Sequence, residues 1–233
     1  MSCRICGEKV LKVIDLGESP PSNAYLSKEN RDKLENILPL KIFVCEECWL
    51  VQTEDFASRE TFFDGSYAYF SSASKSWLKH ASDYVDMIVD EIGLNKKKFV
   101  TEIASNDGYL LKNFLKKNIP CLGVEPTEST AIASMNLGIE VLQKFFGEAT
   151  ALEIQSNYGH SDLIIGNNVY AHVPDINDFT KGLKILLNKN GTINLEFPHI
   201  VNLIKKNQWD TIYHEHYSYF SVLTLQSIFK YHG

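Results

Sequence analysis

Residues 99–114, FVTEIASNDGYLLKNF, decide the fold class of this chain. The stretch begins as a short apolar strand that ends at the acidic residue Glu102, and it continues through a turn of small and polar residues at 104–108. The residues after the turn have the apolar spacing of one helix face. In α/β folds, a strand, a tight turn and a helix in this order bring backbone N–H groups and a helix N-terminus to a small ligand. We therefore expect a ligand site around this turn.

Strands and helices are expected to alternate after the turn. A second short strand ends at Glu125, and an acidic residue at that place commonly accepts hydrogen bonds from ribose hydroxyls. Further strands are predicted within residues 139–142 and 161–175, and residues 190–196 are predicted to form a turn at Asn190 and Gly191 followed by a strand. Within residues 161–175 the strand comes first, and a polar loop carrying Asn168 and His172 follows it. The alternation predicts an α/β fold with a doubly wound, Rossmann-like sheet and a site at the carboxyl ends of its strands.

The turn departs from the G-x-G-x-x-G pattern of dinucleotide-binding proteins. Ala104 and Asn106 stand where glycines are expected, and only Gly108 is a glycine. Asn tolerates a positive φ better than most residues, so the turn can still form.

Composition limits the classes of partner. The chain has 233 residues with 23 basic and 29 acidic side chains, and this excess of acid disfavours nucleic acid as a partner. No apolar run approaches the roughly 20 residues that span a bilayer, and the N-terminal MSCRICGEKV lacks a hydrophobic signal region. We therefore expect a cytoplasmic protein without nucleic-acid or membrane partners.

Four of the five cysteines form two C-x2-C pairs, at Cys3, Cys6, Cys45 and Cys48. In a reducing compartment such pairs indicate metal more often than disulfides, and four thiolates are the set that structural zinc prefers. Two disulfides or four unrelated buried thiols are the alternatives. Cys121 stands alone and is expected to be an ordinary buried thiol.

Two stretches between the cysteines and the central turn carry candidate ligand contacts. Asn23 follows a Pro-Pro pair that forces an extended path, and it either faces a ligand or lies in an ordinary loop. In SYAYFSSAS, Tyr67 and Tyr69 are two residues apart and could share one face of an extended segment. Each of these tyrosines either lines a site or simply packs.

The segment QWDTIYHEHYSYFS, residues 208–221, contains the strongest catalytic candidates. Tyr213, His214, Glu215 and His216 place several titratable groups side by side, which favours proton transfer. A solvated polar loop, an H-x-H metal pair and tyrosines that merely pack are the alternatives.

Taken together, these motifs resemble one family. CRICG, DLGESPPSNAYL, CEECWLVQ, SYAYFSS, EIASNDGYLL, GVEP, NNVYAHVPD and the segment from EFPHIVNLI to WDTIYHEHYSYFS look like the zinc-containing, S-adenosylmethionine-dependent sugar C-methyltransferases. Those enzymes act on nucleotide-linked keto-deoxysugars, and the resemblance covers essentially the whole chain. It implies a zinc-binding domain over residues 1–70 and a class I methyltransferase domain over residues 71–233.

The resemblance also implies roles for individual residues. The base that removes a proton next to the ketone, giving an enolate carbon that takes the methyl group, corresponds to His216. The residues that support it or hold the sugar correspond to Glu215, Tyr213, His172 and either Tyr67 or Tyr69, and Asn23 stays a separate candidate for substrate binding. The turn would bind S-adenosylmethionine with Glu125 on the ribose, so the implied cofactor residues are Glu102, Ala104, Ser105, Asn106, Asp107, Gly108, Glu125, Pro126 and Asn168. A carbon methylase needs such a base because carbon is a poor nucleophile until it is deprotonated.

Chains of this family continue into a second α/β domain beyond the point that corresponds to FKYHG. We therefore expect this chain to lack the sugar-binding domain, as a fragment, a split or decayed gene or a short form, and to have a separate C-terminal domain or chain as a partner beside the nucleotide-sugar substrate. Two alternative functions stay open. One is a zinc-stapled module with impaired catalysis that binds S-adenosylmethionine or a partner, and the other is a methyltransferase for a different small-molecule acceptor.

Overall fold

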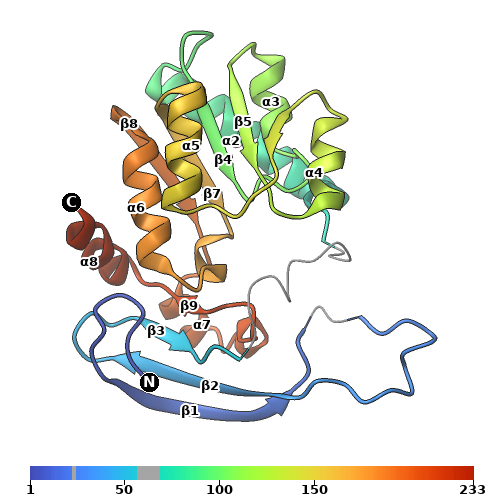
Figure 1. Ribbon diagram of the computed structural model, residues 1–233, viewed down its shortest axis with the longest axis vertical. Coiled ribbons are helices and arrows are strands. Elements are labelled where there is room, and N and C mark those ends of the chain that lie inside the picture. The colour runs from blue at the N-terminus through green and yellow to red at the C-terminus, as the bar shows by residue number, and fades with distance from the viewer. Residues whose placement is uncertain (23–24, 57–68) are drawn as a thin grey trace. The chain divides into compact units, whose positions relative to one another are not determined.

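The computed structural model describes residues 1–22, 25–56 and 69–233 (Figure 1). The contacts of these residues divide the chain into two compact units. The first unit combines residues 1–62 with 168–180 and 196–233, and the second combines residues 63–167 with 181–195. The units therefore do not follow chain order, and the domain boundary expected at residue 70 stays a prediction.

A mainly parallel sheet forms the centre of the second unit. Among the described residues it has five strands in the order β6-β5-β4-β7-β8. Their bounds are β4 (Val100–Ile103), β5 (Cys121–Val124), β6 (Glu140–Leu142), β7 (Ser161–Asn167) and β8 (Leu187–Glu196). β4 pairs in parallel with β5 and β7, and β5 pairs in parallel with β6. The order changes direction at β4, the strand of the predicted turn, which confirms the prediction of a Rossmann-like sheet.

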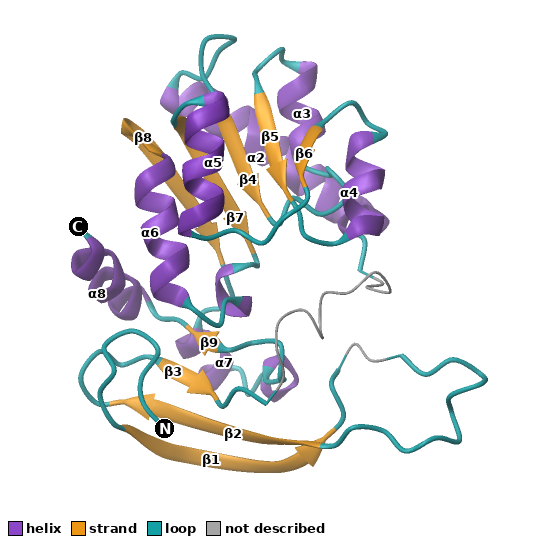
Figure 2. Ribbon diagram, viewed as in Figure 1, coloured by secondary structure: helices purple, strands orange, loops and turns teal. Residues whose placement is uncertain are grey.

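Helices connect these strands and cover the sheet. They are η1 (Ser71–Ala73), α2 (Lys75–Ile92), α3 (Leu111–Lys116), α4 (Glu128–Met135), α5 (Glu148–Tyr158) and α6 (Ile176–Leu186). The Ser74 side chain accepts the Trp77 N–H and so caps the start of α2, and Gly93, with φ 65°, ends it in the left-handed region. Figure 2 shows α5 in front of the sheet and α2 behind it, which agrees with a β4 whose four residues are all buried.

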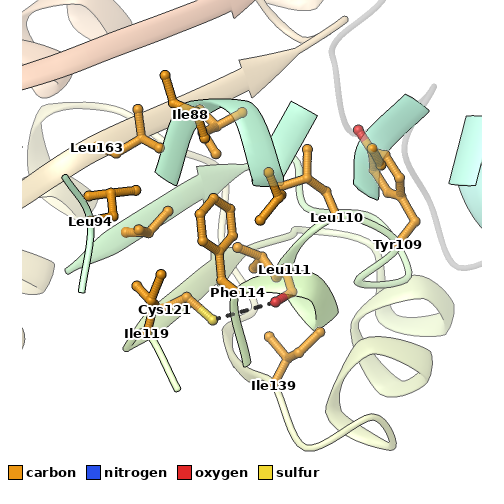
Figure 3. Packing of buried hydrophobic residues seen from close by; sticks show 14 residues of the cluster. Ile88, Leu94, Tyr109, Leu110, Leu111, Phe114, Ile119, Cys121, Ile139 and Leu163 are labelled. Carbon is orange, nitrogen blue, oxygen red and sulfur yellow. Dashed lines mark hydrogen bonds between the residues drawn. The ribbon is translucent and has the colours of Figure 1, made fainter. Parts of the chain in front are cut away.

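The core of the second unit lies between the sheet and α2 and α3 (Figure 3). Phe114 is fully buried there, among apolar residues of α2, β4 and β7. In the same cluster, the Cys121 Sγ lies 3.9 Å from the Leu111 carbonyl oxygen. Burial raises the pKa of Cys121 to about 12, so it is a neutral buried thiol, as expected.

One local prediction was wrong. The sequence predicted a turn at Asn190 and Gly191, but both residues lie inside β8. A Cβ on Gly191 would stand 2.9 Å from the Ser161 carbonyl oxygen and 2.8 Å from Leu187 Cδ1. The glycine therefore serves a close approach between backbones and not a turn.

The first unit contains an antiparallel sheet built from both ends of the chain. In the described part of the chain it has the order β1-β2-β3-β9, with bounds β1 (Val10–Ser19), β2 (Leu38–Cys45), β3 (Val51–Thr53) and β9 (Ser218–Tyr219). β3 pairs with β9 through Val51 with Tyr219 and Gln52 with Ser218. This pairing brings the residues after the second cysteine pair next to the residues after His216.

Short helices complete the first unit. They are η2 (Tyr170–His172), α7 (Ile200–Lys205), η3 (Trp209–Thr211) and α8 (Val222–His232). A small buried cluster of Ile42, Leu203 and Tyr219 joins α7 to the sheet. No helix among the described residues is both long enough and apolar enough to cross a membrane.

Candidate active site

The turn after β4 has an unusual backbone. Ala104, Asn106 and Gly108 have φ values of 55°, 50° and 76°, so alternate residues of the turn are in the left-handed region. Alternation of this kind turns neighbouring N–H groups toward a common side, and such concavities bind anionic or electron-rich groups. The turn therefore forms without the first two glycines, as the sequence analysis expected.

Side chains of the turn fix it to neighbouring segments of the second unit. Asn106 N donates to Glu125 Oε2 at 2.9 Å, and Thr127 N donates to Glu125 Oε1 at 2.9 Å. The Asn106 side chain accepts from Ser71 N at 2.9 Å and donates to the Tyr69 carbonyl at 3.1 Å. A glycine at this position could make neither side-chain contact.

Asp107 makes a similar contact. Its Oδ2 accepts from Ser72 N at 3.0 Å, so the turn holds the start of the helical region before α2. Glu125 receives two backbone N–H groups, and the side chains of Thr127 and Thr130 also bond to it, although burial still raises its pKa. Its assignment to the ribose stays a prediction.

Glu102 is the least compensated charged group of the second unit. It is 1% exposed, and neither carboxylate oxygen has a hydrogen bond of normal geometry within the described residues. Burial raises the pKa of Glu102 well above its usual value, and the charges of Glu125 and Asp107 raise it further, although the nearby Tyr109 hydroxyl opposes them. A buried carboxyl with free acceptors beside this turn suits a cationic ligand that donates hydrogen bonds.

Gly108 has no space for a side chain. A Cβ there would lie 2.4 Å from Ile139 Cδ1 and 2.7 Å from Ser134 Oγ. The one glycine that the turn keeps is therefore the one against which α4 packs.

His216 lies in the first unit with both ring nitrogens in contact with defined partners. Its Nδ1 is 2.9 Å from the Thr211 carbonyl oxygen, and its Nε2 is 2.9 Å from the Tyr213 hydroxyl. Because a carbonyl can only accept, we assign the proton to Nδ1, which leaves Nε2 as the basic nitrogen. The segment thus holds a histidine in the tautomer that a base requires.

The groups around this imidazole keep it neutral. The His172 ring meets it edge-on with centroids 4.6 Å apart, and the Tyr219 ring does so at 5.8 Å. Burial lowers the pKa of His216 to about 4. Burial and the nearby His216 lower the pKa of His172 to about 3. Both rings are therefore uncharged at neutral pH and able to accept or share a proton.

Glu215 contacts a different residue, Ser22. It is 1% exposed, and its Oε1 accepts from the Ser22 hydroxyl at 3.4 Å. Ser22 precedes Asn23, which lies outside the described residues. The structure thus brings Tyr213, His216 and His172 together around one imidazole, with Glu215 next in the chain.

The remaining predicted residues are placed as follows. Asn168 is exposed, has φ 53° and bonds to Glu196 through its Nδ2 at 2.8 Å. Tyr69 is 58% exposed, Pro126 is half-buried, and Tyr67 lies outside the described residues. By contacts Asn168 belongs to the first unit and the turn to the second, so the structure does not group these predicted cofactor residues in one unit.

Sequence reasoning missed Thr211, whose carbonyl sets the His216 tautomer. Every residue has a carbonyl, so no sequence signal could have identified it. It also missed Thr53, whose hydroxyl donates to the His216 carbonyl at 3.0 Å.

The four paired cysteines form one cluster in the first unit. Their Sγ atoms all lie within 4.8 Å of one another, and three of the separations are 3.4, 3.5 and 3.8 Å. Tetrahedral zinc with Zn–S bonds of about 2.3 Å needs S–S edges of roughly 3.8 Å, so the cluster fits this ion. All five cysteines are free thiols, which argues against the disulfide alternative.

Comparison with known proteins identifies the family. A family model described as "Putative zinc binding domain" matches residues 3–63, and a second, described as "Methyltransferase domain", matches residues 77–233. The chain belongs to this methyltransferase family. Its cofactors are accordingly S-adenosylmethionine and, at the four cysteines, zinc, as the sequence analysis predicted.

Individual relatives agree with this assignment. The chain is 34% identical to C-methyltransferase NovU of Streptomyces niveus over 232 residues, which are 99% of this chain and 55% of the relative. It therefore spans about half the length of the curated relative that it matches. A SAM-dependent methyltransferase of Archaeoglobus fulgidus has a TM-score of 0.51 at 18% identity, covering 65% of this chain and 68% of the other. That likeness supports the class I methyltransferase fold alone.

Proposed function

We propose that this chain is the catalytic portion of an S-adenosylmethionine-dependent C-methyltransferase that methylates a carbon next to the ketone of a nucleotide-linked deoxysugar. The observation that carries the proposal is the state of His216, a buried, neutral imidazole held with its proton on Nδ1. The similarity to a C-methyltransferase supports carbon as the acceptor.

The proposed reaction uses His216 as the base. Its Nε2 takes the proton from the carbon beside the ketone, and the electron pair of that C–H bond forms the enolate. When bound, S-adenosylmethionine would supply the electrophilic methyl group to that carbon, with the electron pair of the broken carbon–sulfur bond remaining on sulfur.

The neighbours of His216 suit this step. The Tyr213 hydroxyl lies 2.9 Å from Nε2 in the free site. When substrate takes its place beside Nε2, this hydroxyl can donate to the developing enolate oxygen. Protonation of Nε2 gives an imidazolium whose Nδ1–H is already bonded to the Thr211 carbonyl, which stabilises the charged form. Burial lowers the pKa of His216 to about 4 in the free site, and the negative charge that develops on the substrate during the transfer favours the imidazolium.

Deuterium exchange tests the base without requiring methyl transfer. A panel of nucleotide-linked keto-deoxysugars is incubated with the chain in D2O, alone and with the C-terminal part of the relative supplied as a second chain. We expect exchange at one carbon beside the ketone, and a loss of about 10²–10⁴-fold in His216→Gln. His214→Gln is the matched control, because His214 is also buried and bonds through Nε2 to the Leu38 carbonyl at 3.2 Å.

The outcomes separate the alternatives. Equal exchange in the His216→Gln and wild-type proteins would refute the assignment of the base. Calorimetric binding of S-adenosylmethionine without exchange on any sugar, in either arrangement, would favour a cofactor-binding module. Methyl transfer that persists in His216→Gln would favour a different acceptor.

A further inference from the structure

Gln52 connects the first cysteine pair to the sheet of the first unit. This side chain is 1% exposed, and both ends of its amide are bonded to the backbone around Cys3. Its Oε1 accepts from Arg4 N at 3.0 Å, and its Nε2 donates to the Ser2 carbonyl at 3.1 Å. Gln52 thus fixes a metal-binding loop to β3.

Thr53, the next residue, connects β3 to His216. It is 1% exposed, and its hydroxyl donates to the His216 carbonyl at 3.0 Å. Its backbone N–H donates to the Tyr217 carbonyl at 3.1 Å. Because Val51 and Gln52, just before Thr53, pair with Tyr219 and Ser218, the backbone of His216 has a fixed position relative to β3.

Arg4, between the first two cysteines, makes a second connection to the same place. Its Nη2 donates to the Thr53 carbonyl at 2.9 Å, and its guanidinium lies 5.1 Å from the centroid of the Tyr217 ring. The Arg4 side chain is 8% exposed and also pairs with Asp55. Asn177 Nδ2 donates to the Arg4 carbonyl at 3.0 Å, so this loop is held from several sides.

We propose that the cysteine-bound zinc sets the position of His216 through Gln52 and Thr53, so that Thr53 is a positioning residue for the imidazole. Only the statement that His216 acts as the base depends on the proposed function. The physical reason is that residues 6–9 of the first cysteine loop are not buried, so the loop depends on the metal for its order. Without metal, Gln52 loses fixed partners, and the backbone that places His216 Nδ1 against the Thr211 carbonyl can shift.

Nuclear magnetic resonance of the histidine side chains tests this link. Imidazole ¹⁵N shifts report the tautomer directly, and His216→Gln assigns the His216 signals. In the zinc-loaded chain we expect Thr53→Val to change the His216 shifts toward a mixture of tautomers, and Thr53→Ser, which keeps a hydroxyl, to restore them. Thr150→Val is the control, because Thr150 is also buried and bonds through its hydroxyl to a carbonyl, that of Phe145 at 2.8 Å, but belongs to the second unit.

The metal itself is tested on the wild-type chain. Removal of zinc with a chelator should move the His216 signals in the same direction as Thr53→Val, and Gln52→Leu with zinc bound should do so as well. If zinc removal unfolds the whole unit, the two zinc-loaded variants decide the question.

Activity provides a second readout where the proposed function holds. A misplaced base should lower kcat about 10- to 100-fold in Thr53→Val with little change in KM. Unchanged His216 signals in Thr53→Val and Gln52→Leu, or an equal change in Thr150→Val, would overturn the proposal. Because the spectra need no substrate, they can support the link even if the deuterium-exchange test rejects His216 as the base.

Discussion

Replacing Gly108 with alanine tests whether the turn after β4 depends on close packing or only on backbone freedom. Gly108 has φ 76°, and a Cβ there would lie 2.4 Å from Ile139 Cδ1, 2.7 Å from Ser134 Oγ and 3.3 Å from Ser134 Cα. The Ile139 methyl group can rotate away, but the backbone of Ser134 can move only with α4. Gly93 is the matched control, because it has φ 65° in the same unit and nothing within 4 Å of its would-be Cβ.

The expected magnitudes follow from these two environments. An alanine in the left-handed region costs about 1–2 kcal/mol, and this cost applies to both substitutions. Forcing a methyl group into a packed site costs about 1–3 kcal/mol more, and this cost applies to Gly108→Ala alone. We therefore expect the free energy of unfolding to fall by about 2–5 kcal/mol in Gly108→Ala and by about 1–2 kcal/mol in Gly93→Ala.

Urea denaturation followed by tryptophan fluorescence measures the difference. Trp77 lies in α2 of the second unit and stacks on Tyr109, with ring centroids 6.1 Å apart. Replacing the exposed Trp49 and Trp209 with phenylalanine makes Trp77 the sole reporter. If the two glycine variants lose the same stability within about 0.5 kcal/mol, the packing argument is wrong.

Two further predictions concern the second unit. The pKa of Glu102 is higher in the folded chain than in the unfolded chain, so folding is favoured when this carboxyl is protonated. Its contribution to stability is complete below about pH 4.3 and is lost as the pH rises through the pKa of the folded state. Glu102→Gln should remove that loss and raise the free energy of unfolding by about 1–3 kcal/mol at pH 8 but not at pH 4; equal effects at both pH values would contradict this. Phe114→Ala should lower the free energy of unfolding by about 3–5 kcal/mol, whereas Leu152→Ala, at a 49% exposed position of α5, should change it by no more than about 0.5 kcal/mol; urea titrations at pH 7 compare them.

The sequence predicted the elements of the second unit because each is encoded locally. The apolar run before the turn and the helical spacing after it appear as β4 and α3, and the two cysteine pairs meet as one cluster. The false turn at Asn190 and Gly191 shows the limit of local signals. A glycine that serves the approach of a neighbouring strand cannot be distinguished, within its own segment, from a glycine that turns the chain.

The site in the first unit depended on pairings that sequence patterns do not encode. Val51 pairs with Tyr219 across most of the chain, and this pairing is what places Thr53 against His216. The Thr211 carbonyl contributes through its position alone. The resemblance identified His216 as a candidate base, but the hydrogen-bond partners that fix its tautomer become visible only in the folded chain.

The departure of the turn after β4 from the glycine-rich pattern has a physical explanation. Glycine is kept at 108, where a side chain would collide with α4, and is absent at 104 and 106, where the left-handed backbone costs about 1–2 kcal/mol in another residue. At Asn106 that cost is offset by an amide that binds both Ser71 and the Tyr69 carbonyl, contacts that glycine could not make. Asn in place of glycine at 106 therefore costs backbone strain but adds a fixed connection between the turn and the segment before α2. A turn held in this way keeps its shape before any ligand arrives, which lowers the entropy that binding must overcome.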